Sequence, residues 1–178
     1  LGAAEGVLIP ELYHHRPEIE ILDRNVFKEL NDFTNSEMKQ FLKDLIQTLE
    51  TRLSSVIQEN KIDLIITNNI WSVALNLPAA IALENVRRKL KLPAIAHHHD
   101  FYWERKGKIA LTCPVAIDTM DRYFPPRSSL IKHVVINSIA QNELKERKGI
   151  KSTIIPNVFD FDPPGWLIDE YNQDLRER

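Results

Sequence analysis

Apolar residues recur at steps of three and four along residues 34–57, a pattern that indicates one buried helix face. Thr34 opens this stretch and Glu37 follows three residues later, the spacing of a capping box. The pattern therefore predicts a long amphipathic helix that packs on the rest of the protein through one side. The apolar positions are Met38, Phe41, Leu42, Leu45, Ile46, Leu49, Leu53, Val56 and Ile57.

Short apolar runs predict four β-strands. Residues 64–66 are continuously apolar, which is typical of a strand buried on both faces. Further strands are expected over residues 93–98, 133–136 and 152–155, each bounded by polar or turn-forming residues. These runs are too short to be independent helices, so they predict a sheet.

Helices are expected between some of these strands. Asn76 and Pro78 resemble a helix start, and the helix continues to Lys91. Ser138 caps the next helix, with Gln141 completing a second capping box and Gly149 placed to end it. Residues 1–33 and 106–127 show no regular period, so the expected order is helix, strand, helix, strand, strand, helix, strand.

Strands separated by helices are joined by crossover connections. The pattern therefore predicts an α/β fold: a Rossmann-like, doubly wound, mainly parallel sheet with helices on both faces. Residues 1–155 are expected to form this domain. Pro156 and Asn157 then mark an interdomain hinge within residues 156–178, which end in a docking helix carrying Leu167, Tyr171 and Leu175.

Composition limits the classes of partner. The 178 residues include 23 basic and 25 acidic side chains, and the net charge of -2 gives no general attraction for nucleic acid or anionic membranes. The single Cys113 excludes an internal disulfide and fits a reducing, cytoplasmic location. Charges interrupt every apolar run before the ~20 residues that a membrane-spanning helix needs. We therefore expect a cytoplasmic protein with no transmembrane segment and no nucleic-acid partner.

Most of the candidate chemistry follows the strand expected over residues 93–98. His97, His98, His99 and Asp100 stand there, followed closely by three aromatic residues and Arg105. Ligands of open α/β sheets bind beyond the carboxyl ends of the strands, so this segment is the expected site. Side chains alternate along a strand, which prevents the three imidazoles from converging on one metal ion. A zinc site would need further ligands, for which His133 and Asp118 are candidates.

Other residues near the strand ends have both a functional and a structural interpretation. Asn68 and Asn69 can bind sugar hydroxyls or simply form a turn. Trp103 can stack on a sugar ring or belong to the core. Arg105 can pair with Glu104 or hold an acidic acceptor through two hydrogen bonds. The helix that begins at Ser138 is expected to face the cleft, where its amino terminus can hold an anion.

Four segments together resemble a known family. They are Asn68-Asn69, the string from His98 to Arg105, residues 135–138 and residues 155–161. This combination resembles the amino-terminal half of the retaining, nucleotide-sugar-dependent glycosyltransferases of the glycogen-synthase-like group, known as group 1. The resemblance implies two Rossmann-like domains facing across a cleft. The amino-terminal domain holds the acceptor, and the carboxy-terminal domain holds the sugar nucleotide.

The resemblance also implies roles for single residues. His98 or His99 faces the reacting sugar, Asp100 orients the imidazole or the acceptor, and Pro156 and Asn157 hinge the domains. The implied reaction transfers a hexosyl unit from a sugar nucleotide to a sugar or small glycan acceptor with retention. The sugar nucleotide is a substrate, and neither a further cofactor nor a metal ion is expected.

The chain departs from the family pattern at both ends. Family members begin with a strand and a glycine-rich loop near the donor phosphates, whereas residues 1–6 follow no such strand. The carboxy-terminal domain, with its paired glutamates, is absent from the sequence. We therefore expect a fragment that lacks a partner domain and is inactive alone. Two alternatives stay open: a metal-dependent hydrolase using the His97 to Asp100 cluster, and a non-catalytic Rossmann-like binding module.

Overall fold

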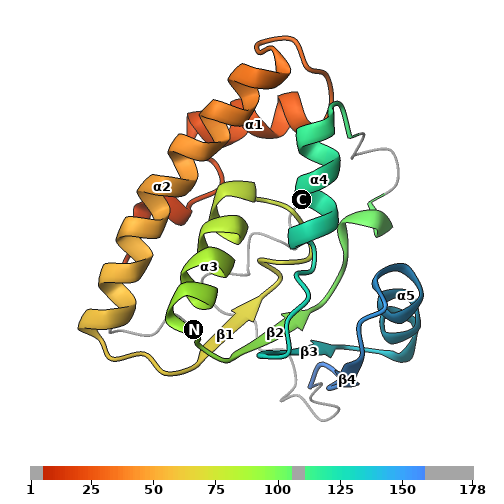
Figure 1. The fold of residues 1–178 in the computed structure, drawn as a ribbon. Helices are drawn as coiled ribbons and strands as arrows, with labels where there is room; N and C mark the ends of the chain where they lie inside the picture. Colours follow the sequence, from red (N-terminus) through yellow and green to blue (C-terminus); the bar gives the residue numbers. More distant parts are fainter. Residues whose placement is uncertain (1–5, 106–110, 159–178) are drawn as a thin grey trace, which may run out of the picture.

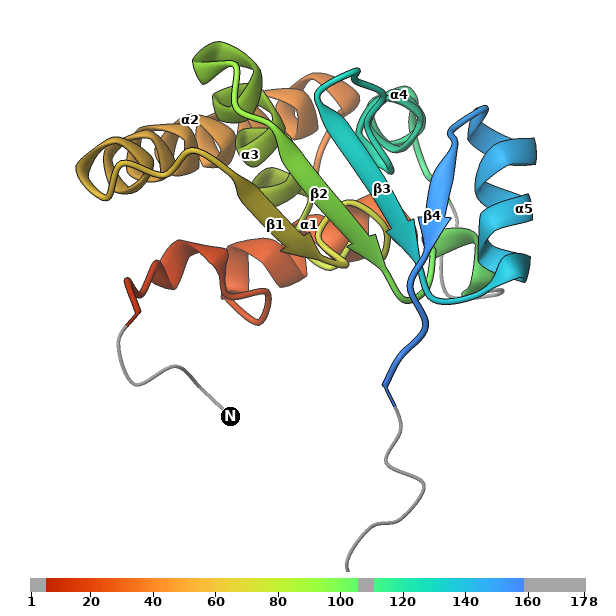
Figure 2. The same ribbon diagram turned by 90° about the horizontal axis from the view of Figure 1, so that it is seen from below.

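A computed structural model describes residues 6–105 and 111–158 of the chain. Its centre is a four-stranded sheet in which every neighbouring pair of strands is parallel and the order is β1-β2-β3-β4 (Figure 1, Figure 2). The predicted α/β, Rossmann-like fold with a parallel sheet is confirmed. The strands are β1 (Ile65–Asn68), β2 (Ala94–His98), β3 (Ile131–Val135) and β4 (Ser152–Ile154).

One helix connects each pair of consecutive strands. These helices are α3 (Leu77–Leu90), α4 (Pro114–Tyr123) and α5 (Ser138–Lys148). The strand order follows the chain order and does not reverse within the described residues. Such an order is found on one side of the switch point in a doubly wound sheet. Because all strands run the same way, their carboxyl ends lie along one edge.

The long helix α2 (Asn35–Glu59) forms as predicted. The Thr34 hydroxyl accepts a hydrogen bond from the Glu37 amide at 3.3 Å, and the Thr34 amide donates to the Glu37 carboxylate at 2.8 Å. This reciprocal pair is the predicted capping box. The helix runs beside α3 (Figure 1). Its apolar stripe packs in the main hydrophobic core together with α3 and with Ile65 of β1.

Two helices were not predicted: α1 (Pro17–Phe27) and α4 each occupy a segment that showed no clear period. Both begin at a proline, with no hydrogen bond from a capping side chain. Their length of 10 or 11 residues leaves few apolar positions from which to recognise a period. Two short 3-10 turns, Pro10–Leu12 and Tyr102–Glu104, were also unforeseen.

The predicted ends of α3 are confirmed and one predicted end of α5 is wrong. Asn76 caps α3 by accepting a hydrogen bond from the Ala79 amide. The cap of α5 is Asn137, whose side-chain oxygen accepts from the Ala140 amide at 2.8 Å. Ser138 is instead the first helical residue and is exposed, because the extended backbone that a cap requires occurs one residue earlier. Gly149 ends α5 with a φ of 65°, as predicted.

Strand β1 is buried on one face only, contrary to the expectation for residues 64–66. Ile65 and Thr67 are buried, whereas Ile66 is 69% exposed. Ile66 shares its face of the sheet with Ile95 of β2 and the exposed Lys132 of β3, so this face is open in that row, whereas the face of Ile65 and Thr67 is packed.

The remaining predictions concern the two ends of the chain. Pro156 and Asn157 follow β4 as exposed chain without regular structure. The expected docking helix, with Leu167, Tyr171 and Leu175, lies outside the described residues. Within the described ranges, no helix has both the length and the apolar character that crossing a membrane requires.

Candidate functional site

The carboxyl edge of the sheet brings together residues that the sequence placed at separate strand ends. Asn69 follows β1, and His99 and Asp100 follow β2, its parallel neighbour. In the register of the two strands Asn68 stands beside His97, so the segments leave the sheet together. This edge is where ligands of open parallel sheets bind.

Asn69 links the two strand ends through its side chain. Its oxygen accepts a hydrogen bond from the His99 amide at 2.7 Å and from the Ser72 hydroxyl at 3.3 Å. Its amide nitrogen donates to Oδ1 of Asp100 at 3.2 Å. Asn69 adopts a left-handed backbone with a φ of 60°, which asparagine tolerates better than most residues. The residue therefore positions both His99 and Asp100.

Asp100 is also held from the opposite side by Arg105. Nε and an amino nitrogen of Arg105 donate to Oδ2 of Asp100 at 3.2 and 2.8 Å. Both side chains are 35% exposed, so the pair is open to a ligand. A carboxylate has about four acceptor positions and a guanidinium five N–H groups. Each member therefore keeps hydrogen-bonding capacity for a substrate, with Asp100 accepting and Arg105 donating.

The histidines divide between two environments, as strand alternation predicts. The rings of His97 and His99 lie 4.6 Å apart, and both are partly exposed. Burial, followed by the charge of His99, lowers the pKa of His97. Nε2 of His97 is buried and makes no hydrogen bond within the described residues. His97 is therefore neutral, and its ring lies beside the ring of His99.

His98 lies on the other side of the strand, in the core. It is 1% exposed and contacts the rings of Phe101 and His133. Burial, followed by the neighbouring imidazoles, lowers the pKa of His98. The structure thus brings His99 and Asp100 to the open edge and keeps His98 beneath it.

Trp103 is fixed by side chains of α5. Its indole nitrogen donates to the Glu143 carboxylate at 2.9 Å, and the Arg147 guanidinium lies 5.5 Å from its ring centre. Phe101 stacks on the same ring at 4.3 Å. Through these contacts the indole attaches the loop after β2 to α5. They favour the structural interpretation of Trp103 over stacking on a sugar ring.

Asn68 and Ser138 do not join the network around Asn69. Asn68 is the exposed last residue of β1, and Ser138 is exposed at the start of α5. Neither side chain makes a hydrogen bond within the described part of the chain. Sequence analysis missed Ser72, Glu143 and Arg147, which position the site residues. Only spatial proximity connects them to the site, because no motif contains them.

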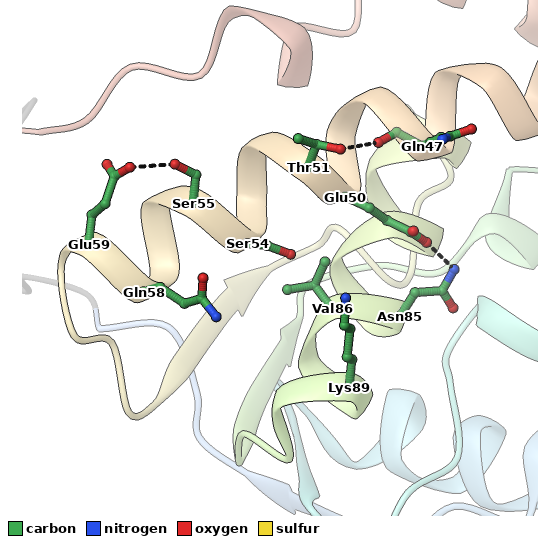
Figure 3. A pocket seen from close by; sticks show the side chains of 10 residues that line it. All are labelled: Gln47, Glu50, Thr51, Ser54, Ser55, Gln58, Glu59, Asn85, Val86 and Lys89. Carbon is green, nitrogen blue, oxygen red and sulfur yellow. Dashed lines mark hydrogen bonds between the residues drawn. The ribbon is translucent and has the colours of Figure 1, made fainter.

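A separate hollow of about 700 Å³ lies between α2 and α3, away from the strand ends (Figure 3). Asn85 of α3 donates to the Glu50 carboxylate of α2 across it at 2.7 Å. Ser55 and Glu59 bond to each other along α2. The hydrogen bond from Asn85 to Glu50 therefore ties α3 to α2 across this hollow. In the described ranges, no group of three or more His, Cys, Asp or Glu side chains is arranged to hold a metal ion.

Comparison with known proteins gives two relatives. The chain is 37% identical to the mannosylglucosylglycerate synthase of Petrotoga mobilis over 172 residues, which are 97% of this chain and 39% of that protein. It is 40% identical to the mannosylglucosylglycerate synthase of Thermotoga maritima over 164 residues, 90% of this chain and 36% of that protein. Both names describe a glycosyltransferase.

The chain therefore spans well under half the length of the curated relatives that it matches. No protein-family model matches the chain, and no solved structure matches it. The similarity extends over nearly all of the chain. It supports a glycosyltransferase of which this chain is a part.

Proposed function

We propose that this chain is the acceptor-side part of a longer glycosyltransferase of group 1, which transfers a hexosyl unit from a sugar nucleotide with retention. The similarity to two glycosyltransferases over 90% or more of the chain carries this proposal. The relatives are named for the synthesis of mannosylglucosylglycerate, so we take mannose as the transferred sugar and glucosylglycerate as the acceptor. No further cofactor or metal ion is required by this proposal.

The acceptor supplies a chemical reason for Arg105. Glucosylglycerate carries one carboxylate, and a guanidinium binds a carboxylate through two parallel hydrogen bonds. Asp100 holds Arg105 through Nε and one amino nitrogen, so the second amino nitrogen remains available among the described contacts. Arg105 binds the glycerate carboxylate, and Asp100 fixes the direction of the guanidinium.

Asp100 and His99 then face the reacting hydroxyl. In the reaction the acceptor oxygen bonds to the anomeric carbon, the bond from that carbon to the nucleotide diphosphate breaks, and the hydroxyl proton leaves with the diphosphate. Asp100 accepts a hydrogen bond from the acceptor hydroxyl and orients it. His99 lines the same edge, and His98 supports it from the core.

The remaining assignments are secondary to this arrangement. Asn68 lies exposed beside Asn69 and contacts sugar hydroxyls, and the amino terminus of α5 at Ser138 faces the donor. Pro156 and Asn157 lead out of the sheet toward the rest of the longer protein. Stabilisation of the departing diphosphate requires groups beyond those described here. The 178-residue chain alone is therefore expected to be inactive.

The decisive experiment uses the complete gene product that contains this chain. It is assayed with a panel of sugar nucleotides and with two acceptors, glucosylglycerate and the uncharged glucosylglycerol. We expect mannosyl transfer to glucosylglycerate, with the anomeric configuration of donor and product identical by NMR. Binding of a sugar without any turnover would favour a non-catalytic module and would overturn the proposal.

A matched pair of variants tests the acceptor contact. Arg105→Gln should raise the KM for glucosylglycerate at least about tenfold, because a charge-assisted pair is lost. The same variant should leave the KM for glucosylglycerol within about twofold, since that acceptor has no carboxylate. Arg52→Gln, an exposed change on α2, is the control and should alter neither value. Equal effects of Arg105→Gln on both acceptors would contradict the role of Arg105.

A further inference from the structure

A polar hollow of about 420 Å³ lies at the amino ends of the strands, whereas Asp100 lies at their carboxyl ends. Ser128 and Ser129 form part of its wall just before β3 begins at Ile131. The Leu130 carbonyl of the same segment accepts a hydrogen bond from the first amide of β2 at Ala94. The hollow therefore lies at the amino ends of β2 and β3, and a ligand there does not occupy the proposed transfer site.

Three guanidinium groups from different segments line this hollow. Arg88 comes from the last turn of α3, Arg122 from the last turn of α4, and Arg127 from the loop before β3. Cations in a last helical turn also offset the helix dipole, which accounts for part of the placement of Arg88 and Arg122. Arg127 belongs to no helix, but its Nε binds the Lys148 carbonyl at the carboxyl end of α5, so it also offsets a helix dipole. The dipoles of three separate helices do not account for the gathering of all three guanidinium groups around one hollow.

The carboxylate in the wall does not neutralise these charges. Both oxygens of Glu84 accept hydrogen bonds from the buried Arg87, at 2.7 and 2.8 Å. Glu84 and Arg87 therefore balance each other. Among the described contacts, Arg122 pairs with the exposed Asp118 at 3.3 Å, a pair of small energetic value, and its guanidinium lies 5.6 Å from the ring centre of Tyr123.

Several N–H and O–H groups beside the hollow have no hydrogen-bond acceptor among the described residues. Arg127 donates through Nε to the Lys148 carbonyl at 2.8 Å, which fixes the side chain and leaves its two amino nitrogens available. The Ser128 hydroxyl oxygen accepts from Arg87 and from the Leu130 amide, both at 3.2 Å. Its own proton must therefore be donated elsewhere, and the hollow is adjacent.

We propose that this hollow, lined by Arg88, Arg122, Arg127 and Ser128, binds the phosphate or diphosphate group of a small molecule. Phosphate presents three strongly accepting oxygens, and arginine binds them in a bidentate manner. A single carboxylate would satisfy fewer of the available donors. The position at the amino edge of the sheet makes this a second site, independent of the proposed glycosyl transfer.

The test measures binding of pyrophosphate to the 178-residue chain by NMR titration. We expect saturable shifts of the Ser128 and Ser129 amides and of the Nε signals of the three arginines. The double variant Arg88→Gln/Arg122→Gln should raise the Kd at least about tenfold, because two charge-assisted contacts are removed. Arg52→Gln removes an exposed positive charge from α2 and should change the Kd less than about twofold.

The amide spectrum of each variant reports whether the fold is intact. Arg88 and Arg122 are exposed, so we expect native spectra for the double variant. Arg127→Lys provides a second measurement, since it keeps the charge and loses the bidentate geometry, and it should also weaken binding. Equal weakening by Arg52→Gln, shifts centred on Arg105 or Ser138, or no saturable shift at all would each overturn the proposal.

Discussion

Nε2 of His98 lies 3.0 Å from Nδ1 of His133, and the two buried rings stack with their centroids 5.3 Å apart. One of these two nitrogens carries the proton and donates it to the other. Both imidazoles are neutral in this arrangement, and adding a proton to either one would bury a charge.

This pair predicts that the protein loses stability in mild acid. Burial lowers the pKa of His98 to about 3 and that of His133 to about 4. The unfolded histidines have a pKa of about 6.5 and bind protons first. Stability is therefore complete above pH about 6.5 and falls toward pH 4, by at most about 1.4 kcal/mol per pH unit for each histidine. Denaturant unfolding at pH 7, 6 and 5 measures this slope.

The variant His133→Gln isolates one member of the pair. It removes one titrating group, so the loss of stability between pH 7 and 5 should be roughly halved. The exposed His15→Gln is the matched control and should keep the full slope. An unchanged slope in His133→Gln would mean that other groups cause the acid sensitivity.

Asn69→Gly tests the link between the first two strand ends. Glycine accepts the left-handed backbone at this position, so the change removes the side chain without adding strain. The His99 amide and Asp100 each lose a partner, and we expect about 1–3 kcal/mol of destabilisation. Asn68→Ala on the exposed end of β1 should stay within about 0.5 kcal/mol. Comparable losses in both variants would contradict the role of Asn69.

Glu84→Gln breaks the buried ion pair of α3. Arg87 is 1% exposed and would keep its charge without a carboxylate partner. We expect a loss of about 3–5 kcal/mol in the free energy of unfolding. Asp118→Asn breaks the exposed pair with Arg122 and should cost less than about 1 kcal/mol. Chemical denaturation of both variants gives the comparison, and similar small losses would show that the buried pair is dispensable.

Asn137→Ala and Ser138→Ala distinguish the two candidate caps of α5. Loss of the hydrogen bond from Asn137 to the Ala140 amide should cost about 1 kcal/mol. The exposed Ser138 makes no cap, so its replacement should stay within about 0.5 kcal/mol. Thermal unfolding of the two variants measures the difference, and the reverse order of stability would restore Ser138 as the cap.

Local pattern and tertiary structure contributed different parts of the fold. The periodic apolar stripe of α2 and the capping residues Thr34 and Asn76 acted over three or four residues, and the sequence predicted those helices. Helix α4 was missed because it is short and has no side-chain cap. The exposure of Ile66 depends on which face of the sheet the helices cover, and the short apolar run of residues 64–66 does not specify that.

The candidate site divides in the same way. The chain alone determined that Asn69 and Asp100 follow two strands, since a strand's direction and end are local properties. Only the tertiary structure decided that Asn69 bonds the His99 amide 30 residues away, that His98 meets His133 across 35 residues, and that Trp103 meets Glu143 across 40. Such contacts depend on strand register and helix packing, which bring distant residues within hydrogen-bond reach and leave no periodic trace in the sequence.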